Sequence, residues 1–287
     1  MKKSLICSSF VLKIIAIVTM TLDHIGVYLT QFPSYSSTFT VGYIFRIIGR
    51  IAFPLFAFML VEGALHTKNW KRYLSRLLSL MVLVLVAQIV LDYGFHYKIN
   101  QGNIFIDLSL GLIMIVCFEN KKKIVKLLGI LPILYGFISL LCYYLEYKHL
   151  VSNLQILWFP YFIRCQYYFL SIFLILAIYL CYKLLPRLYK MYGLNPDLNA
   201  DTLKYRVQLN LLASLCLLFF ACVGIVLDHF SLACWSTDIQ SYMILAIAPI
   251  MLYNGRRGYN SKWFKICTYL YYPVHLVIIA AIFFVIL

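Results

Sequence analysis

The chain has 287 residues, of which 63% are hydrophobic and only 12% are charged, and its mean hydropathy is +0.87. Soluble domains carry about twice this charged fraction, so the composition excludes an ordinary soluble domain and predicts a protein embedded in a bilayer. The net charge of +15 comes from short basic clusters between apolar runs. No basic stripe is present, which argues against a nucleic-acid partner.

Long apolar runs recur along the chain. In lipid the backbone polar groups must be satisfied within each span, so the sequence predicts an all-α, polytopic transmembrane bundle. We expect about nine spans in a single domain over residues 1–287. They are 8–31, 41–65, 73–94, 103–118, 124–145, 166–185, 208–229, 239–254 and 264–286. The fourth and eighth are short, and 151–163 fits either a re-entrant or an interfacial segment. The nine cysteines show no metal-site spacing, so no metal is predicted.

The basic residues predict the orientation of the bundle. With the N-terminus inside, the inside segments hold 19 of the 25 Lys and Arg residues, Lys2 and Lys3 among them. The outside segments hold only Lys98, Lys148 and Arg164. Cytoplasmic loops carry such an excess, so we expect a cytoplasmic N-terminus.

The first predicted span carries three polar groups that are costly in lipid, Lys13, Asp23 and His24. Lys13 and His24 are eleven residues apart, so they share one helix face and lie about 16–17 Å apart along the axis. Structural readings stay open, because Lys13 can reach the headgroups and His24 can pair with Asp23. The interrupted apolar run and the lack of a cleavage site predict a retained helix rather than a signal peptide.

The second predicted span carries Arg46 and Arg50, which stack on one face in its outer half. Pro54 follows and predicts a kink. Glu62 lies near the cytoplasmic end of this span. The two arginines either serve a reaction or form structural ion pairs. Their candidate partners are Asp23, Asp107 and Asp228.

Four segments together resemble a known family. They are LKIIAIVTMTLDHIG (12–26), RIIGRIAFPLFAFMLVEGALHTKNWKRYLSRLL (46–78), NIFIDLSLGL (103–112) and YYPVHL (271–276). These segments resemble the TraX family, which is related to the membrane-bound acyltransferase-3 superfamily. That superfamily has a basic residue, ten intervening residues and a histidine in its first helix, and Lys13 and His24 have this spacing.

The resemblance implies an acetyltransferase of the bacterial cytoplasmic membrane. Such an enzyme moves an acetyl group from cytoplasmic acetyl-CoA to an acceptor amine or hydroxyl. TraX is associated with acetylation of a pilin N-terminus, so the implied acceptor is a pilin or peptide amine, or a glycan. The expected partners are therefore the lipid bilayer, acetyl-CoA and an acceptor.

Acyl transfer gives roles to the polar groups. A base must take the acceptor proton, and imidazole suits this at neutral pH, so His24 is the candidate base, with Asp23 or another Asp of the outer half fixing its tautomer. Arg46 or Arg50 lies at the depth needed to stabilise the oxyanion or to hold an anionic acceptor group. The phosphates of acetyl-CoA need cytoplasmic cations, and the candidates are Lys13, Lys68, Lys71, Arg72 and Arg76. Further candidates for the site are Glu62 and His275.

Two other classes of function stay open. Intramembrane Lys, Asp, Arg and His also occur in transporters and flippases of small polar substrates, although the sequence shows no inverted repeat. A noncatalytic scaffold is the third reading, and the charged positions in the first two spans argue against it. His275, in the last span, fits either a helix–helix hydrogen bond or a place in the site.

Overall fold

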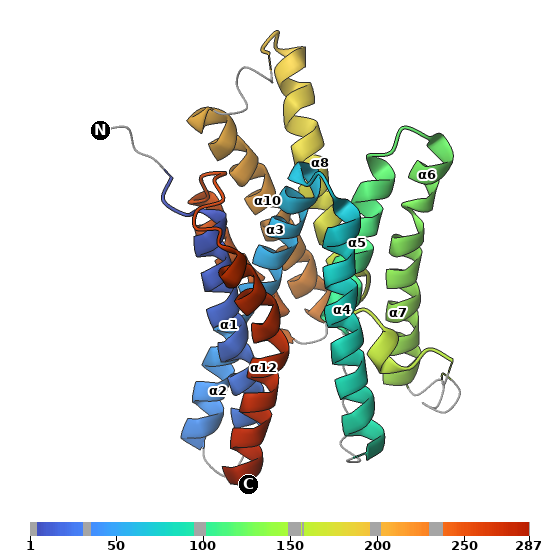
Figure 1. Ribbon diagram of the computed structural model, residues 1–287, viewed down its shortest axis with the longest axis vertical. Coiled ribbons are helices and arrows are strands. Elements are labelled where there is room, and N and C mark those ends of the chain that lie inside the picture. The colour runs from blue at the N-terminus through green and yellow to red at the C-terminus, as the bar shows by residue number, and fades with distance from the viewer. Residues whose placement is uncertain are drawn as a thin grey trace. The chain divides into compact units, whose positions relative to one another are not determined.

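The computed structural model describes residues 5–30, 36–94, 102–148, 156, 158–195, 202–229 and 238–286 (Figure 1). These residues form helices, which confirms the predicted all-α class, and one isolated bridge joins Cys7 to Tyr253. The predicted segment 151–163 falls partly outside the described residues. Lys2, Lys3 and Lys98, which count toward the predicted orientation, also lie outside them.

The elements follow the apolar runs in chain order. They are α1 (Ser9–Leu29), α2 (Ser36–Gly49), α3 (Ala52–His66), α4 (Trp70–Ile89), the π-helix η1 (Val90–Gly94), α5 (Ile104–Phe118), α6 (Lys123–Leu128), α7 (Leu131–Tyr147), the 3₁₀ helix η3 (Tyr161–Ile163), α8 (Tyr168–Met191), α10 (Leu203–His229), the 3₁₀ helix η4 (Asp238–Ala246), α11 (Ile247–Met251) and α12 (Lys262–Ile286).

Seven helical segments in the described residues are long and apolar enough to cross a membrane. Two shorter apolar helices, Ile104–Phe118 and Ile239–Met251, coincide with the fourth and eighth predicted spans, which the sequence also marks as short. Each predicted apolar run therefore corresponds to a helix. The count of nine spans and the cytoplasmic N-terminus stay predictions.

The second predicted span forms two helices, and the break between them lies about one turn before Pro54. Proline has no N–H and its ring crowds the carbonyl four residues earlier, here that of Arg50. α2 ends at Gly49 and α3 begins at Ala52. Between them the N–H groups of Arg50 and Ile51 donate to carbonyls three residues back, at 3.1 and 3.2 Å. The predicted kink is thus present as a tight turn at residues 50–51.

The chain forms two compact units, each described by itself. Unit 1 comprises residues 1–59, 177–225 and 238–287, and unit 2 comprises residues 60–176 and 226–237. In unit 1, α1 packs along α2 on one side and along α12 on another (Figure 1). α1 begins at Ser9 because the Ser8 hydroxyl accepts a hydrogen bond from Val11 N–H at 3.4 Å.

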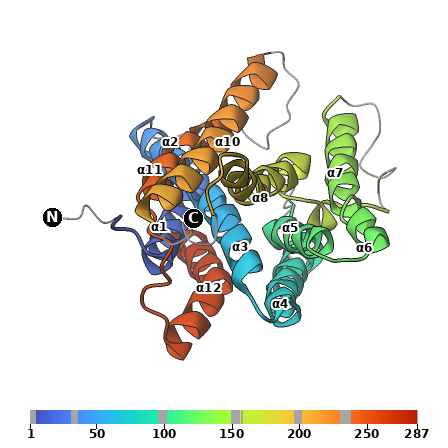
Figure 2. The same ribbon diagram turned by 90° about the horizontal axis from the view of Figure 1, so that it is seen from above.

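In unit 2, α5 packs against α4 and α7 (Figure 2). Asn103 caps α5 by accepting a hydrogen bond from Phe105 N–H at 3.1 Å. Its side-chain amide also donates to Met81 O at 3.0 Å, which ties the start of α5 to α4. α5 is apolar and buried along most of its length.

Buried polar groups fix the segment before α8 to α5 and α7. Arg164 donates two hydrogen bonds to the Glu146 carboxylate, at 2.6 and 2.9 Å. Burial alone would lower the pKa of Arg164, but the Glu146 carboxylate raises it above its ordinary value. Asp107 accepts hydrogen bonds from the backbone N–H groups of Gln166 and Tyr167, at 2.7 and 3.2 Å. Asp107, one predicted partner for an arginine, is therefore occupied by backbone amides.

Candidate active site

Glycines bring α1 and α2 into close contact. A β-carbon added at Gly26 would lie 2.6 Å from Gly42 O, and one added at Gly49 would overlap the Asp23 side chain. Small residues allow helices to approach closely where lipid supplies no hydrophobic drive between them. This approach places Asp23 against the end of α2, directly beside Arg50.

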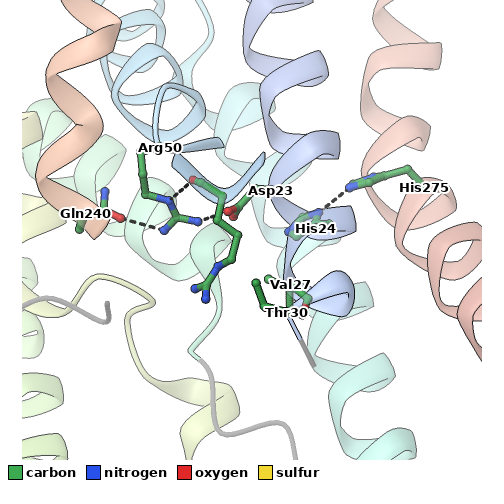
Figure 3. Close-up of polar contacts among 8 residues, drawn as sticks. Asp23, His24, Val27, Thr30, Arg50, Gln240 and His275 are labelled. Atoms are coloured by element: carbon green, nitrogen blue, oxygen red, sulfur yellow. Dashed lines mark hydrogen bonds and ion pairs between the residues drawn. The ribbon is translucent and has the colours of Figure 1, made fainter. Parts of the chain in front are cut away.

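Arg50 lies at the centre of one polar network (Figure 3). Its guanidinium forms an ion pair with Asp23 and donates to Gln240 Oε1 at 2.9 Å. Its Nε donates to Arg46 O at 3.1 Å. The Arg50 side chain is only 5% exposed, and that of Asp23 is 16% exposed. Among the partners that the sequence left open for the arginines, the structure pairs Arg50 with Asp23.

His24 belongs to a second network, between α1 and α12. Its Nδ1 lies 2.8 Å from Nε2 of His275 (Figure 3). Nδ1 of His275 lies 2.8 Å from Tyr271 O. The rings of Tyr271 and His275 stack with their centroids 4.9 Å apart. One further hydrogen bond joins the same two helices, because Thr21 Oγ1 lies 2.6 Å from the Tyr271 hydroxyl.

For neutral imidazoles, the hydrogen-bond partners assign the tautomer of each ring. A carbonyl only accepts, so the proton of His275 is on Nδ1, facing Tyr271 O. Its Nε2 is then an acceptor, and Nδ1 of His24 must carry the proton that lies between the two rings. The remaining nitrogen of His24, Nε2, therefore keeps its lone pair. This is the nitrogen that a general base uses.

Asp23 does not occupy the place that the sequence analysis gave it beside His24. Consecutive residues of a helix point about 100° apart. Asp23 therefore faces α2 and Arg50, whereas His24 faces α12. His275 is hydrogen-bonded to Nδ1 of His24, where the sequence predicted a carboxylate.

Lys13 lies half-buried near the N-terminal end of α1. Its charged neighbours are Lys265, in the first turn of α12, and Arg257, in the preceding loop. Lys13 and His24 thus both face α12 and the loop before it, as their eleven-residue spacing predicts. The other predicted acetyl-CoA ligands are exposed at the start of α4, in unit 2; they are Lys68, Lys71, Arg72 and Arg76.

Glu62 is half-buried in α3 and belongs to unit 2. The His66 ring lies one turn further along, with Nδ1 2.8 Å from Glu62 O. Arg46, by contrast, belongs to unit 1 and lies against α1, since a β-carbon added at Gly26 would lie 2.8 Å from its Cγ. The structure therefore brings Asp23, His24, Arg46, Arg50 and His275 into one unit and leaves Glu62 in the other.

Sequence reasoning missed Gln240. This side chain is fully buried and holds Arg50 through its carbonyl oxygen. The available signal was a glutamine inside the eighth predicted apolar run. In the part of the chain that the structure describes, no group of three His, Cys, Asp or Glu side chains is arranged to hold a metal ion.

Comparisons with known proteins identify relatives of the chain. A family model described as TraX protein matches residues 8–283. The chain is 29% identical over 131 residues to "Probable fimbrial assembly protein FimC, serogroup H1" of Dichelobacter nodosus. That match covers 43% of this chain and 52% of the relative, so the chain spans about half the length of the curated relative that it matches. No solved structure matches the chain.

Proposed function

The chain belongs to the TraX family, and we propose that it is an integral membrane acetyltransferase that moves an acetyl group from acetyl-CoA to an acceptor amine or hydroxyl. The observation that carries this proposal is the row of hydrogen bonds from His24 through His275 to Tyr271 O. This row leaves Nε2 of His24 with a lone pair in a fixed orientation. A general base that activates a nucleophile has this arrangement.

In the proposed reaction, Nε2 of His24 takes the proton of the acceptor N–H or O–H. The acceptor nitrogen or oxygen bonds to the carbonyl carbon of the acetyl thioester. The carbon–sulfur bond then breaks, the sulfur leaves with its electron pair, and His24 returns the proton to it. The products are the acetylated acceptor and free CoA. His275 is a positioning residue, because it acts on the reaction only through His24.

The two arginines have different roles in this proposal. Arg50 is held by Asp23, by Gln240 and by the backbone of Arg46, so it fixes α1, α2 and η4 relative to one another. Arg46 lies along Gly26, two residues beyond His24. We therefore assign Arg46 to the oxyanion that develops on the thioester, where a preorganised donor contributes most to the rate.

The relative in D. nodosus, which is named a probable fimbrial assembly protein, supports a proposal for the acceptor. We propose that the acceptor is an amine or a glycan of a fimbrial or pilus subunit. The predicted orientation puts the acetyl-CoA phosphates on the cytoplasmic side of a bacterial cytoplasmic membrane. His24 lies deeper in the bilayer, where an acceptor terminus would have to insert.

The test uses the purified full chain in lipid nanodiscs with acetyl-CoA labelled on the acetyl group. Acceptors are a pilin-type peptide with a free N-terminus and the same peptide with a blocked N-terminus. We expect label in the free peptide only, released CoA in equal amount, and loss of both in His24→Ala. Passage of a polar substrate across proteoliposomes that hold the same chain, without acetylation, would contradict the proposal and support a transporter.

A further inference from the structure

A short loop at one end of unit 1 presents two arginines between two glycines. The loop sequence is Gly255-Arg256-Arg257-Gly258, and both glycines have positive φ, +75° and +69°. Only glycine adopts this conformation without strain. A β-carbon at Gly258 would also overlap the Ser8 hydroxyl. The backbone thus turns twice and holds Arg256 and Arg257 in a defined position against the start of α1.

The loop is hydrogen-bonded to the segment that leads into α1. Cys7 N–H donates to Leu252 O at 2.9 Å, and Ser9 N–H donates to Arg256 O at 2.8 Å. Phe10 N–H donates to Arg257 O at 3.1 Å. The Phe10 ring also packs against Phe264, with ring centroids 4.8 Å apart. These contacts place Arg256 and Arg257 beside the first turns of both α1 and α12.

Like charges gather at this point. Lys13 of α1 is half-buried, and its charged neighbours are Lys265 of α12 and Arg257 of the loop. None of the ten acidic residues lies within residues 5–22 or 252–286. The ion pairs Arg50–Asp23 and Arg164–Glu146 lie elsewhere. A partly buried cation that lies beside other cations costs free energy, which a bound polyanion offsets.

We infer that Lys13, Arg256, Arg257 and Lys265, named here the basic-loop cluster, bind the phosphate groups of the acyl donor, a nucleotide with several phosphates such as CoA. This inference rests on the proposed function. It assigns the phosphate site to the basic-loop cluster instead of to the exposed basic residues at the start of α4, which the sequence predicted. An arginine guanidinium binds a phosphate through two parallel hydrogen bonds. The N-termini of α1 and α12 add positive potential. From Lys13 to His24 the helix rises about 16–17 Å, a distance that an extended pantetheine arm bridges.

Phosphate chemistry also occurs in anionic lipid headgroups, which basic residues at a membrane surface attract. The two sources differ in one respect. A nucleotide site distinguishes acetyl-CoA from acetyl-pantetheine, which lacks every phosphate, in a bilayer without anionic lipid. A headgroup site does not make this distinction, and its occupancy depends on the anionic lipid content.

The experiment measures the affinity of the full chain for acetyl-CoA and for acetyl-pantetheine in nanodiscs of zwitterionic lipid, and again with anionic lipid added. The test variant is Arg257→Gln/Lys265→Gln. The matched control, Lys121→Gln/Lys122→Gln, removes the same charge from the exposed segment before α6. We expect the test variant to lose acetyl-CoA affinity by about tenfold to hundredfold, with acetyl-pantetheine unchanged and the control equal to wild type. Unchanged thermal unfolding shows that each variant is folded.

Wild-type affinity for acetyl-CoA in the test variant would overturn the inference, and so would a loss confined to the control. A change only in anionic-lipid binding would overturn it in favour of headgroups. If wild type binds acetyl-CoA through this cluster but transfers no acetyl group, the site stands and the proposed function fails. If wild type transfers acetyl groups and the test variant does so with the same KM for acetyl-CoA, the proposed function stands and the site fails.

Discussion

Nδ1 of His24 lies 2.8 Å from Nε2 of His275, although 251 positions separate the two residues in the chain. The first and last predicted spans are therefore joined by an imidazole–imidazole hydrogen bond within the bundle. His275 is only 4% exposed, so neither water nor lipid competes for this contact. The pair fixes which nitrogen of His24 is free to accept a proton.

Replacement of His275 tests this positioning role. His275→Gln keeps an oxygen that can accept from Nδ1 of His24, whereas His275→Phe keeps the ring and removes the acceptor. We expect His275→Phe to lower kcat by about tenfold to hundredfold with little change in the KM for acetyl-CoA, because one hydrogen bond that orients the base is lost. His275→Gln should recover most of the rate.

The acetyl-transfer assay described above gives both constants. A purely structural role would instead lower the amount of folded protein equally in the two variants. Equal kcat in His275→Phe and wild type would contradict the positioning role. An equal loss of kcat in Gln and Phe variants would show that the hydrogen-bond acceptor is not what matters.

The ion pair of Asp23 and Arg50 should support stability rather than acyl transfer. Asp23→Ala leaves the buried Arg50 guanidinium without its carboxylate, and removing one partner of a buried pair costs about 3–5 kcal/mol. Asp23→Asn keeps an accepting oxygen and should cost less. Thermal unfolding in detergent measures both. The double variant Asp23→Ala/Arg50→Met should unfold at a higher temperature than Asp23→Ala, and a lower temperature would argue against a structural pair.

Gly49 sets the distance between α1 and α2. A β-carbon there would overlap Asp23, so Gly49→Ala should separate the helices and weaken the ion pair. We expect a loss of about 1–3 kcal/mol, as for overpacking in general. Gly94→Ala is the matched control, because its β-carbon would have no neighbour nearer than 3.9 Å. Equal melting temperatures for the two variants would contradict the close packing.

Tyr161 makes stability depend on pH at the alkaline end. Burial and a hydrogen bond to Glu146 raise the pKa of Tyr161 to about 12, whereas a tyrosine in the unfolded chain titrates near 10. Below about pH 10 the stabilising contribution is fully present. Between about pH 10 and 12 the unfolded chain loses its proton first, so the free energy of unfolding falls. Chemical unfolding of wild type and Tyr161→Phe checks this, because the variant should show a shallower decline over that range.

The sequence predicts the helices well because each long apolar run must satisfy its backbone within itself. Even the two short spans and the interruption caused by Pro54 follow from local chemistry. The contacts between side chains of different helices do not follow from local chemistry. Spacing within α1 predicts that Lys13 and His24 share a face, but it does not show which helix that face meets. The partner of His24 comes from the other end of the chain.

The site also shows where local reasoning misleads. Asp23 is adjacent to His24 in sequence, which suggested a carboxylate–imidazole pair, but adjacent helix positions point in different directions. Gln240 holds Arg50 from a segment whose sequence resembles any other apolar run with a few polar residues. Arg256 and Arg257 count in the sequence only as loop charges, and their contact with the start of α1 depends on tertiary hydrogen bonds.

The role of His24 as the base of an acetyl transfer is tested by a comparison of rates. The rate of labelled acetyl transfer to an amine acceptor is compared between wild type and His24→Gln in the same nanodiscs, at matched protein amounts and melting temperatures. We expect wild type to transfer label and His24→Gln to be slower by about 10²–10⁴-fold in kcat, the contribution typical of a general base. Transfer at the wild-type rate by folded His24→Gln would contradict it.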